Sequence, residues 1–123
     1  MVKQSDQSAF ITTSLAMNYQ DSGAIVVVKG SSIGAIYRIR DEKQIVLGRD
    51  PNSCDILIKG NTVSRRHMSI CYRPLLQAYE VEDFSSNGSY VEYKKRMIGH
   101  KKYILQRGTT ISLGDQKNVI RLG

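Results

Sequence analysis

The stretch IVLGRDPNSCDILIKGNTVSRRHMSICYR, residues 45–73, contains three short apolar runs separated by turn-forming residues. The third run, MSICY, alternates large apolar residues with small ones. Short runs rich in β-branched residues and bounded by Gly, Pro, Asn and Asp are typical of β-strands joined by loops. No part of the stretch repeats apolar residues at the i, i+3, i+4 spacing of an amphipathic helix. The stretch therefore predicts consecutive strands.

The same pattern continues outward in both directions. The runs are AIVVVKG (24–30), GAIYRIR (34–40), QIVLG (44–48), CDILIKG (54–60), HMSICYR (67–73), AYEVEDF (78–84), SYVEY (89–93), RMIG (96–99), KKYILQ (101–106), TTISLG (109–114) and NVIRL (118–122). They recur roughly every eight to ten residues, which is typical of an all-β antiparallel sandwich or barrel. Loops should gather at the ends of the strands.

The length of 123 residues predicts one domain. Residues 1–22 are rich in Ser, Thr, Gln and Asp without clear periodicity, which predicts a tail ahead of a folded domain at 23–123. Hydrophobic residues make up 41% and charged residues 24%, as in soluble globular proteins. No signal peptide and no apolar run of membrane-spanning length is evident, so we expect an intracellular location and no membrane partner.

The net charge of +7 favours anionic partners: nucleic acid, acidic lipid or phosphorylated protein. Much of it lies in one segment that we interpret as a solvated face, with Lys94, Lys95, Arg96, Lys101, Lys102 and Arg107. Cys54 and Cys71 form no CxxC pair and have no histidine at zinc-ligand spacing. We therefore expect no metal, no cofactor and no disulfide.

Three loops contain hydrogen-bond donors that a sandwich core does not need. They are GRD at 48–50, NTVSRRH at 61–67 and SSNGS at 85–89. A guanidinium can hold two phosphate oxygens, and charge-assisted bonds contribute about 1.5–3 kcal/mol each in a partly dry site. A phosphate monoester has three terminal oxygens that need donors. The donors in these loops are Arg49, Ser64, Arg65, Arg66 and Asn87.

Each loop also has a purely structural interpretation. Arg49 can pair with Asp50 or Asp55, Ser64 can end a turn, and Asn-Gly is a common hairpin signal. Catalysis is a further alternative for Ser64 and His67, acting as nucleophile and base. The sequence indicates no third group and no oxyanion site for such a pair, so we do not expect an enzyme.

Three motifs occur in a fixed order: Gly-Arg, Ser-x-x-His and Asn-Gly. They lie within the segments LGRD, CDILI, TVSRRHMSI, YEVEDFSSNGSYV and GTTISLG. On these motifs the sequence resembles the forkhead-associated (FHA) domain from about Ile25 to Leu122. That family reads phosphothreonine. The resemblance implies an eleven-stranded, SMAD-like β-sandwich of two sheets, with the ligand across loops at one end. The expected partner is a phosphothreonine-containing protein or peptide.

The resemblance also implies roles for individual residues. Arg49 and Ser64 would hold the phosphate with help from Arg65 and Ser86, and Asn87 would clamp the peptide main chain. Structural support would come from Gly48, through an unusual backbone shape, and from His67 and Gly88. The residues expected to set peptide specificity are Asn61, Thr62 and Val63. Val63 is also expected to approach the methyl group of the phosphothreonine.

The third loop departs from the family pattern, because it has serines where threonines are usual. The family's Val-Asn-Gly turn is replaced by VEYKKRMIG after residue 90, which changes the hairpin that follows the loop. By analogy with the family, the domain would recruit its parent signalling protein to phosphorylated partners. The parent would be a protein such as a checkpoint or meiotic kinase in the nucleus. Phosphorylation-dependent self-association is a further expectation. The alternative is a basic nucleic-acid-binding domain, although Tyr93 and Tyr103 are few for base stacking.

Overall fold

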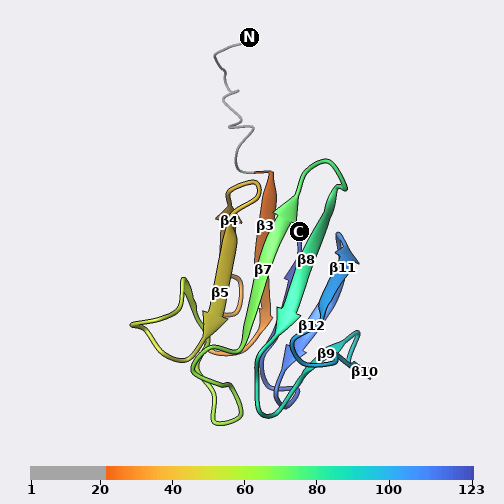
Figure 1. The fold of residues 1–123 in the computed structure, drawn as a ribbon. Helices are drawn as coiled ribbons and strands as arrows, with labels where there is room; N and C mark the ends of the chain where they lie inside the picture. Colours follow the sequence, from red (N-terminus) through yellow and green to blue (C-terminus); the bar gives the residue numbers. More distant parts are fainter. Residues whose placement is uncertain (1–21) are drawn as a thin grey trace.

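The computed structural model describes residues 22–123, so the predicted tail lies outside the described residues except for Ser22. Two sheets face each other (Figure 1). The strands are β3 (Gly23–Lys29), β4 (Ile36–Ile39), β5 (Gln44–Gly48), β6 (Ile56–Leu57), β7 (Met68–Arg73), β8 (Ala78–Asp83), β9 (Ser89–Val91), β10 (Lys95–Arg96), β11 (Lys102–Gln106), β12 (Thr110–Leu113) and β13 (Val119–Leu122). These strands confirm the all-β sandwich prediction.

One sheet has the strand order β10-β9-β12-β13-β3-β4, and the other has the order β11-β8-β7-β5-β6. Neighbouring strands are antiparallel except β5 and β6, which pair in parallel with Leu47 opposite Ile56. The antiparallel expectation therefore holds for all other pairs within residues 22–123. Within the same residues, no helix is long and apolar enough to cross a membrane.

The alternation in the sequence decides which side chains enter the space between the sheets. In β7, Met68, Ile70 and Tyr72 are buried in the core, and Ser69 and Cys71 lie on the outer face between them. Facing strands of the six-stranded sheet contribute further apolar side chains, among them Ile25 and Ile111. Because successive residues of a strand point to opposite faces, one run of sequence supplies both the core and a polar outer surface.

The loops after β5, before β7 and after β8 meet at the lower end of the sandwich in Figure 1, away from the start of β3 and the C-terminus. At the opposite end, the Tyr79 hydroxyl connects β8 to β3 and to the C-terminal residue. It accepts a hydrogen bond from Ala24 N (2.8 Å) and donates one to Gly123 O (2.5 Å). Arg107 is exposed there and packs over the Tyr72 ring, 4.9 Å from its centroid.

Candidate functional site

An open depression of about 380 Å³ lies where the three loops meet. It is lined by Arg49, Ser64, Arg65, Arg66, Phe84 and Ser86. Four of these are predicted site residues from three separate loops, and the fold brings them together. Arg66 is also one of the five donors that the sequence indicates, although no role is predicted for it, whereas nothing in the sequence singles out Phe84.

The first loop is held by its backbone, which leaves the Arg49 side chain free. Arg49 N donates to Ser64 O (3.1 Å), yet the guanidinium forms no hydrogen bond or ion pair with any residue of 22–123. Asp55 accepts a hydrogen bond from Val46 N (2.8 Å) instead of pairing with Arg49. The structural alternative for Arg49 is therefore not found.

Asp50 is likewise engaged within its own turn. Its carboxylate accepts hydrogen bonds from Asn52 N (3.0 Å) and the Ser53 hydroxyl (2.8 Å). These bonds, and to a smaller extent the charges of Arg65 and Arg49, lower the pKa of Asp50. The carboxylate next to Arg49 in the sequence is therefore committed to its own turn, and it is not among the residues that line the depression.

Gly48 supports the site for a different reason from the one predicted. Its φ is not in the left-handed region, so the unusual backbone shape expected from the family is absent. A Cβ at this position would lie 2.1 Å from the carbonyl oxygen of Arg65 and 2.9 Å from the sulfur of Cys54. Gly48 is required because the backbone of the second loop passes directly against it.

Two hydrogen bonds formed by Ser86 and Asn87 join the third loop to the second. Ser86 N donates to the Ser64 hydroxyl (3.1 Å), and the Asn87 side-chain amide donates to Thr62 O (3.2 Å). Because the Ser64 oxygen accepts the Ser86 bond, the hydroxyl proton remains available for a ligand oxygen. Asn87 is exposed on the same loop, next to the depression.

His67 links the same two loops from within the core and is fully buried. Ser64 N donates to Nδ1 (3.0 Å), and Nε2 lies 3.0 Å from Gly88 O, which requires the neutral tautomer with its proton on Nε2. Burial lowers the pKa of His67, although the Gly88 bond and the Asp83 charge oppose this shift. The ring contacts the Ser64 backbone while the Ser64 hydroxyl bonds elsewhere, so the two do not form a nucleophile and base pair.

The third loop is anchored by a carboxylate that the sequence analysis does not single out. Asp83 accepts hydrogen bonds from the hydroxyls of Ser85 (2.7 Å) and Ser89 (2.6 Å). The Ser85 hydroxyl also accepts a hydrogen bond from Gly88 N (2.8 Å), and Gly88 has a φ of +92°. Ser89, which stands where the family usually has threonine, therefore retains a structural use for its hydroxyl, as does Ser85 at the other end of the loop.

The predicted specificity loop is mostly occupied by internal contacts. Val63 is 2% exposed and belongs to the core, so its side chain does not face a ligand. Thr62 accepts a hydrogen bond from Asp115 N on its hydroxyl (3.1 Å), and its carbonyl accepts the Asn87 bond. Asn61 is the exposed member of the three.

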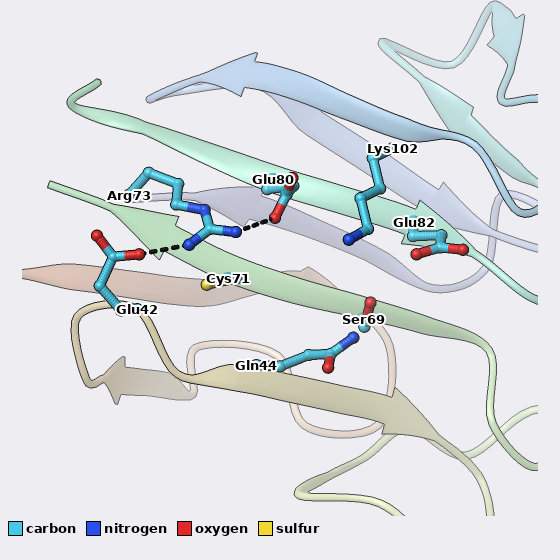
Figure 2. Close-up of a pocket in the computed structure, with 8 residues that line it drawn as sticks. All are labelled: Glu42, Gln44, Ser69, Cys71, Arg73, Glu80, Glu82 and Lys102. Atoms are coloured by element: carbon cyan, nitrogen blue, oxygen red, sulfur yellow. Dashed lines mark hydrogen bonds and ion pairs between the residues drawn. The ribbon is translucent and has the colours of Figure 1, made fainter. Parts of the chain in front are cut away.

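A second hollow, of about 180 Å³, lies on the outer face of the five-stranded sheet (Figure 2). It is lined by Glu42, Gln44, Ser69, Cys71, Arg73, Glu80, Glu82 and Lys102. Arg73 donates to Glu42 (2.5 Å) and to Glu80 (2.6 Å), and these bonds raise the pKa of Arg73. Arg73 is thus paired with two carboxylates, and no predicted site residue lies there.

Comparison with known proteins points to one family. The family model described as FHA domain matches residues 45–114, which is more than half of the chain. The chain is also similar to protein TOS4 of Saccharomyces cerevisiae, with 40% identity over 53 residues, or 42% of this chain. That match spans only 11% of TOS4.

Solved structures give the same result. An FHA domain of a hypothetical Arabidopsis thaliana protein has a TM-score of 0.73 at 25% identity, covering 85% of this chain and 86% of that one. Another structure, described in connection with phosphothreonine-dependent FHA domain interactions, has a TM-score of 0.64 at 25% identity, covering 81% of this chain and 93% of that one. The three site loops lie within the matched segment, between strands that form the two-sheet sandwich. This chain therefore belongs to the FHA domain family.

Proposed function

We propose that this chain is a phosphothreonine-dependent protein-binding module whose ligand phosphate occupies the depression between the three loops. The observation that carries the proposal is the unpaired guanidinium of Arg49, which shares this depression with the available Ser64 hydroxyl. A charged group left without an internal partner, but held at the mouth of a hollow, is suited to a ligand of opposite charge.

The donors match the needs of a phosphate dianion. Arg49 binds two phosphate oxygens, the Ser64 hydroxyl and Arg65 serve the third, and the Ser86 loop closes one side. At about 1.5–3 kcal/mol for each charge-assisted bond, loss of the phosphate removes most of the affinity. Asn87, held by its bond to Thr62 O, presents the rest of its amide to the main chain of the peptide.

Threonine is preferred to serine because of its methyl group. Burial of one methyl group contributes on the order of 1 kcal/mol, which is about fivefold in affinity. A solved FHA domain similar to this chain is described in connection with phosphothreonine-dependent interactions, which supports the same preference here. FHA domains are binding modules and not enzymes.

Recruitment follows from binding: the domain brings its parent protein to partners that have been phosphorylated on threonine. A checkpoint or meiotic kinase as the parent, a nuclear location and phosphorylation-dependent self-association stay predictions from the family resemblance.

The direct test is calorimetric titration with a phosphothreonine peptide selected from a library, compared with the same peptide carrying threonine and phosphoserine. The expected result is micromolar binding of the phosphothreonine peptide, about fivefold weaker binding of the phosphoserine peptide and no measurable binding of the unphosphorylated one. Equal binding of all three peptides would overturn the proposal.

A further inference from the structure

Arg96 lies against the third loop and is not among the residues that line the phosphate depression. It is in β10, paired with Tyr90 of β9, and its Nη2 donates to Ser86 O (3.4 Å). A Cβ on Gly88 would lie 2.6 Å from Arg96 Nε and 3.0 Å from Cζ, so the guanidinium lies directly against this glycine. The Tyr90 ring centroid is 5.9 Å from Cζ. Three neighbours therefore hold an exposed guanidinium in one place.

No carboxylate of residues 22–123 pairs with this guanidinium. Two acidic residues that precede it in the sequence have other partners, because Asp83 accepts from two serine hydroxyls and Glu92 accepts from Thr110 N (2.8 Å). Arg96 has five N–H donors, and its one hydrogen bond within the described chain goes to Ser86 O. An oriented, unpaired guanidinium binds an anion with little loss of side-chain entropy.

Ser86 connects this guanidinium to the phosphate depression. Its N–H donates to the Ser64 hydroxyl (3.1 Å), and its carbonyl accepts from Arg96 (3.4 Å). The N–H and the carbonyl both belong to Ser86, so they are close together. The two hydrogen bonds and this one residue therefore place Ser64 Oγ and Arg96 Nη2 no more than about 10 Å apart. An extended peptide covers about 3.3 Å per residue, so at most about three residues span this separation.

We infer that Arg96 forms a second anion subsite, which selects phosphothreonine peptides that carry another oxyanion within three residues of the phosphothreonine. That oxyanion is the carboxylate of Asp or Glu or a second phosphate. The inference rests on the proposed function. The subsite depends on the hairpin after residue 90, where this chain departs from the family's Val-Asn-Gly turn.

A supporting role for Arg96 in the loop predicts a different result. If the guanidinium only covers Gly88 and holds the Ser86 carbonyl, its removal weakens every phosphothreonine peptide by the same factor. If it binds an oxyanion, its removal weakens only peptides that carry one. The difference between peptides, not the loss of affinity itself, therefore separates the two roles.

The test uses a phosphothreonine peptide with neutral flanks that binds the wild-type chain. Glu is placed singly at each of the three positions before and after the phosphothreonine, and a parallel series carries phosphoserine at the same positions. Affinities are measured at physiological salt for the wild type, Arg96→Gln, Arg96→Lys and the matched control Lys95→Gln. Neighbouring residues of a strand point to opposite faces, so the control removes one positive charge from the same hairpin without touching the Ser86 loop.

We expect one position at which Glu improves wild-type affinity about fivefold, with a larger gain for phosphoserine because of its greater charge. Arg96→Gln should abolish this gain and leave the neutral peptide within about twofold. Arg96→Lys should retain part of the gain, because it keeps the charge without the planar fork. Lys95→Gln should retain it fully.

A gain that survives in Arg96→Gln, the absence of any gain in the wild type, or an equal loss for all peptides would overturn the inference. The neutral phosphothreonine peptide would still bind in each of these cases, so the proposed function would stand. Displacement of the neutral peptide by duplex DNA in the wild type but not in Arg96→Gln would also overturn it, in favour of nucleic acid. Failure of every phosphothreonine peptide to bind the wild type would instead reject the proposed function.

Discussion

The backbone N–H of Ser64 donates a 3.0 Å hydrogen bond to Nδ1 of His67, a ring that is fully buried. The other ring nitrogen lies 3.0 Å from Gly88 O, so the imidazole spans the two loops that carry Ser64 and Asn87. A stiff side chain with one donor and one acceptor thus sets the distance between these loops. The distance between the two loops therefore depends on a buried residue that is not among those lining the depression.

Replacement of His67 by alanine should lower the free energy of unfolding by about 2–4 kcal/mol, because it leaves a cavity and removes partners from a buried N–H and a buried carbonyl. Urea denaturation followed by circular dichroism measures this change. His100→Asn is the control, since His100 is exposed with φ of +61° and Asn tolerates that conformation. Equal losses for the two variants would contradict the linking role of His67.

His67 also predicts how stability depends on pH. Burial lowers the pKa of His67 below its ordinary value of 6.5, so below pH 6.5 the unfolded chain binds a proton that the folded chain does not. The free energy of unfolding should therefore fall as the pH drops below 6.5, by at most about 1.4 kcal/mol per pH unit, and level off below the folded pKa. The loss should be absent above pH 6.5, where both states are neutral.

Urea titrations between pH 5 and 8, without peptide, measure this slope while most carboxylates stay ionised. Omission of the peptide matters because a phosphate monoester itself titrates near pH 6. His67→Gln should flatten the profile in this range. An unchanged slope in that variant would assign the dependence to other groups.

Arg49→Ala should weaken phosphothreonine peptide binding by at least tenfold with little change in the unfolding midpoint. The reason is that the guanidinium forms no hydrogen bond or ion pair with residues 22–123, so its removal breaks nothing in the folded chain. Loss of two charge-assisted bonds to phosphate accounts for the expected effect. Arg121→Ala is the matched control, because it removes an exposed arginine from β13 and should change affinity less than twofold. Similar losses in both variants would indicate a general effect of charge.

The sequence predicts the fold well because strand formation here depends on local information. Each of the eleven apolar runs overlaps a strand, although β10 shares only Arg96 with the run at 96–99. The alternation of Met68, Ile70 and Tyr72 correctly separates the core from the outer face of β7. The turn formers mark the loops, and the ordered motifs indicate which loops meet. The parallel pairing of β5 with β6 is not visible in the pattern, because it depends on the path of the loop between them.

Other parts of the site depend on packing between distant segments, which the sequence does not display. The contact of Gly48 with the Arg65 carbonyl requires the two loops to be in place. Val63 stands beside polar residues in the sequence but turns into the core. Arg96 belongs to a run of basic residues that looks like a solvated face, and only the hairpin register brings it to Ser86 and Gly88.

Gly48→Ala should destabilise the domain by about 2–4 kcal/mol and weaken phosphothreonine peptide binding, because the added carbon would lie 2.1 Å from a backbone oxygen that cannot move alone. Gly108→Ala is the control that distinguishes destabilisation by a steric contact from destabilisation by backbone strain. Gly108 has a φ of +88° but nothing within 4 Å of an added Cβ, so a loss of about 1 kcal/mol and unchanged affinity are expected. Thermal unfolding and calorimetric titration measure both. Equal destabilisation would show that the contact with Arg65 is of little consequence.

Tyr79→Phe should lower the free energy of unfolding by about 1–2 kcal/mol, because it leaves Ala24 N without its acceptor. It also removes one of the two donors to Gly123 O, which keeps its hydrogen bond from Arg107 (3.0 Å). The packing of the ring against Tyr72, 4.8 Å between centroids, remains in the variant. The lost hydroxyl lies at the opposite end of the sandwich from the three loops (Figure 1), so phosphothreonine peptide affinity should stay within about twofold. If affinity falls in a variant that is still folded, the two ends of the sandwich are coupled through the β7 and β8 pair, and the loops are not positioned by local contacts alone.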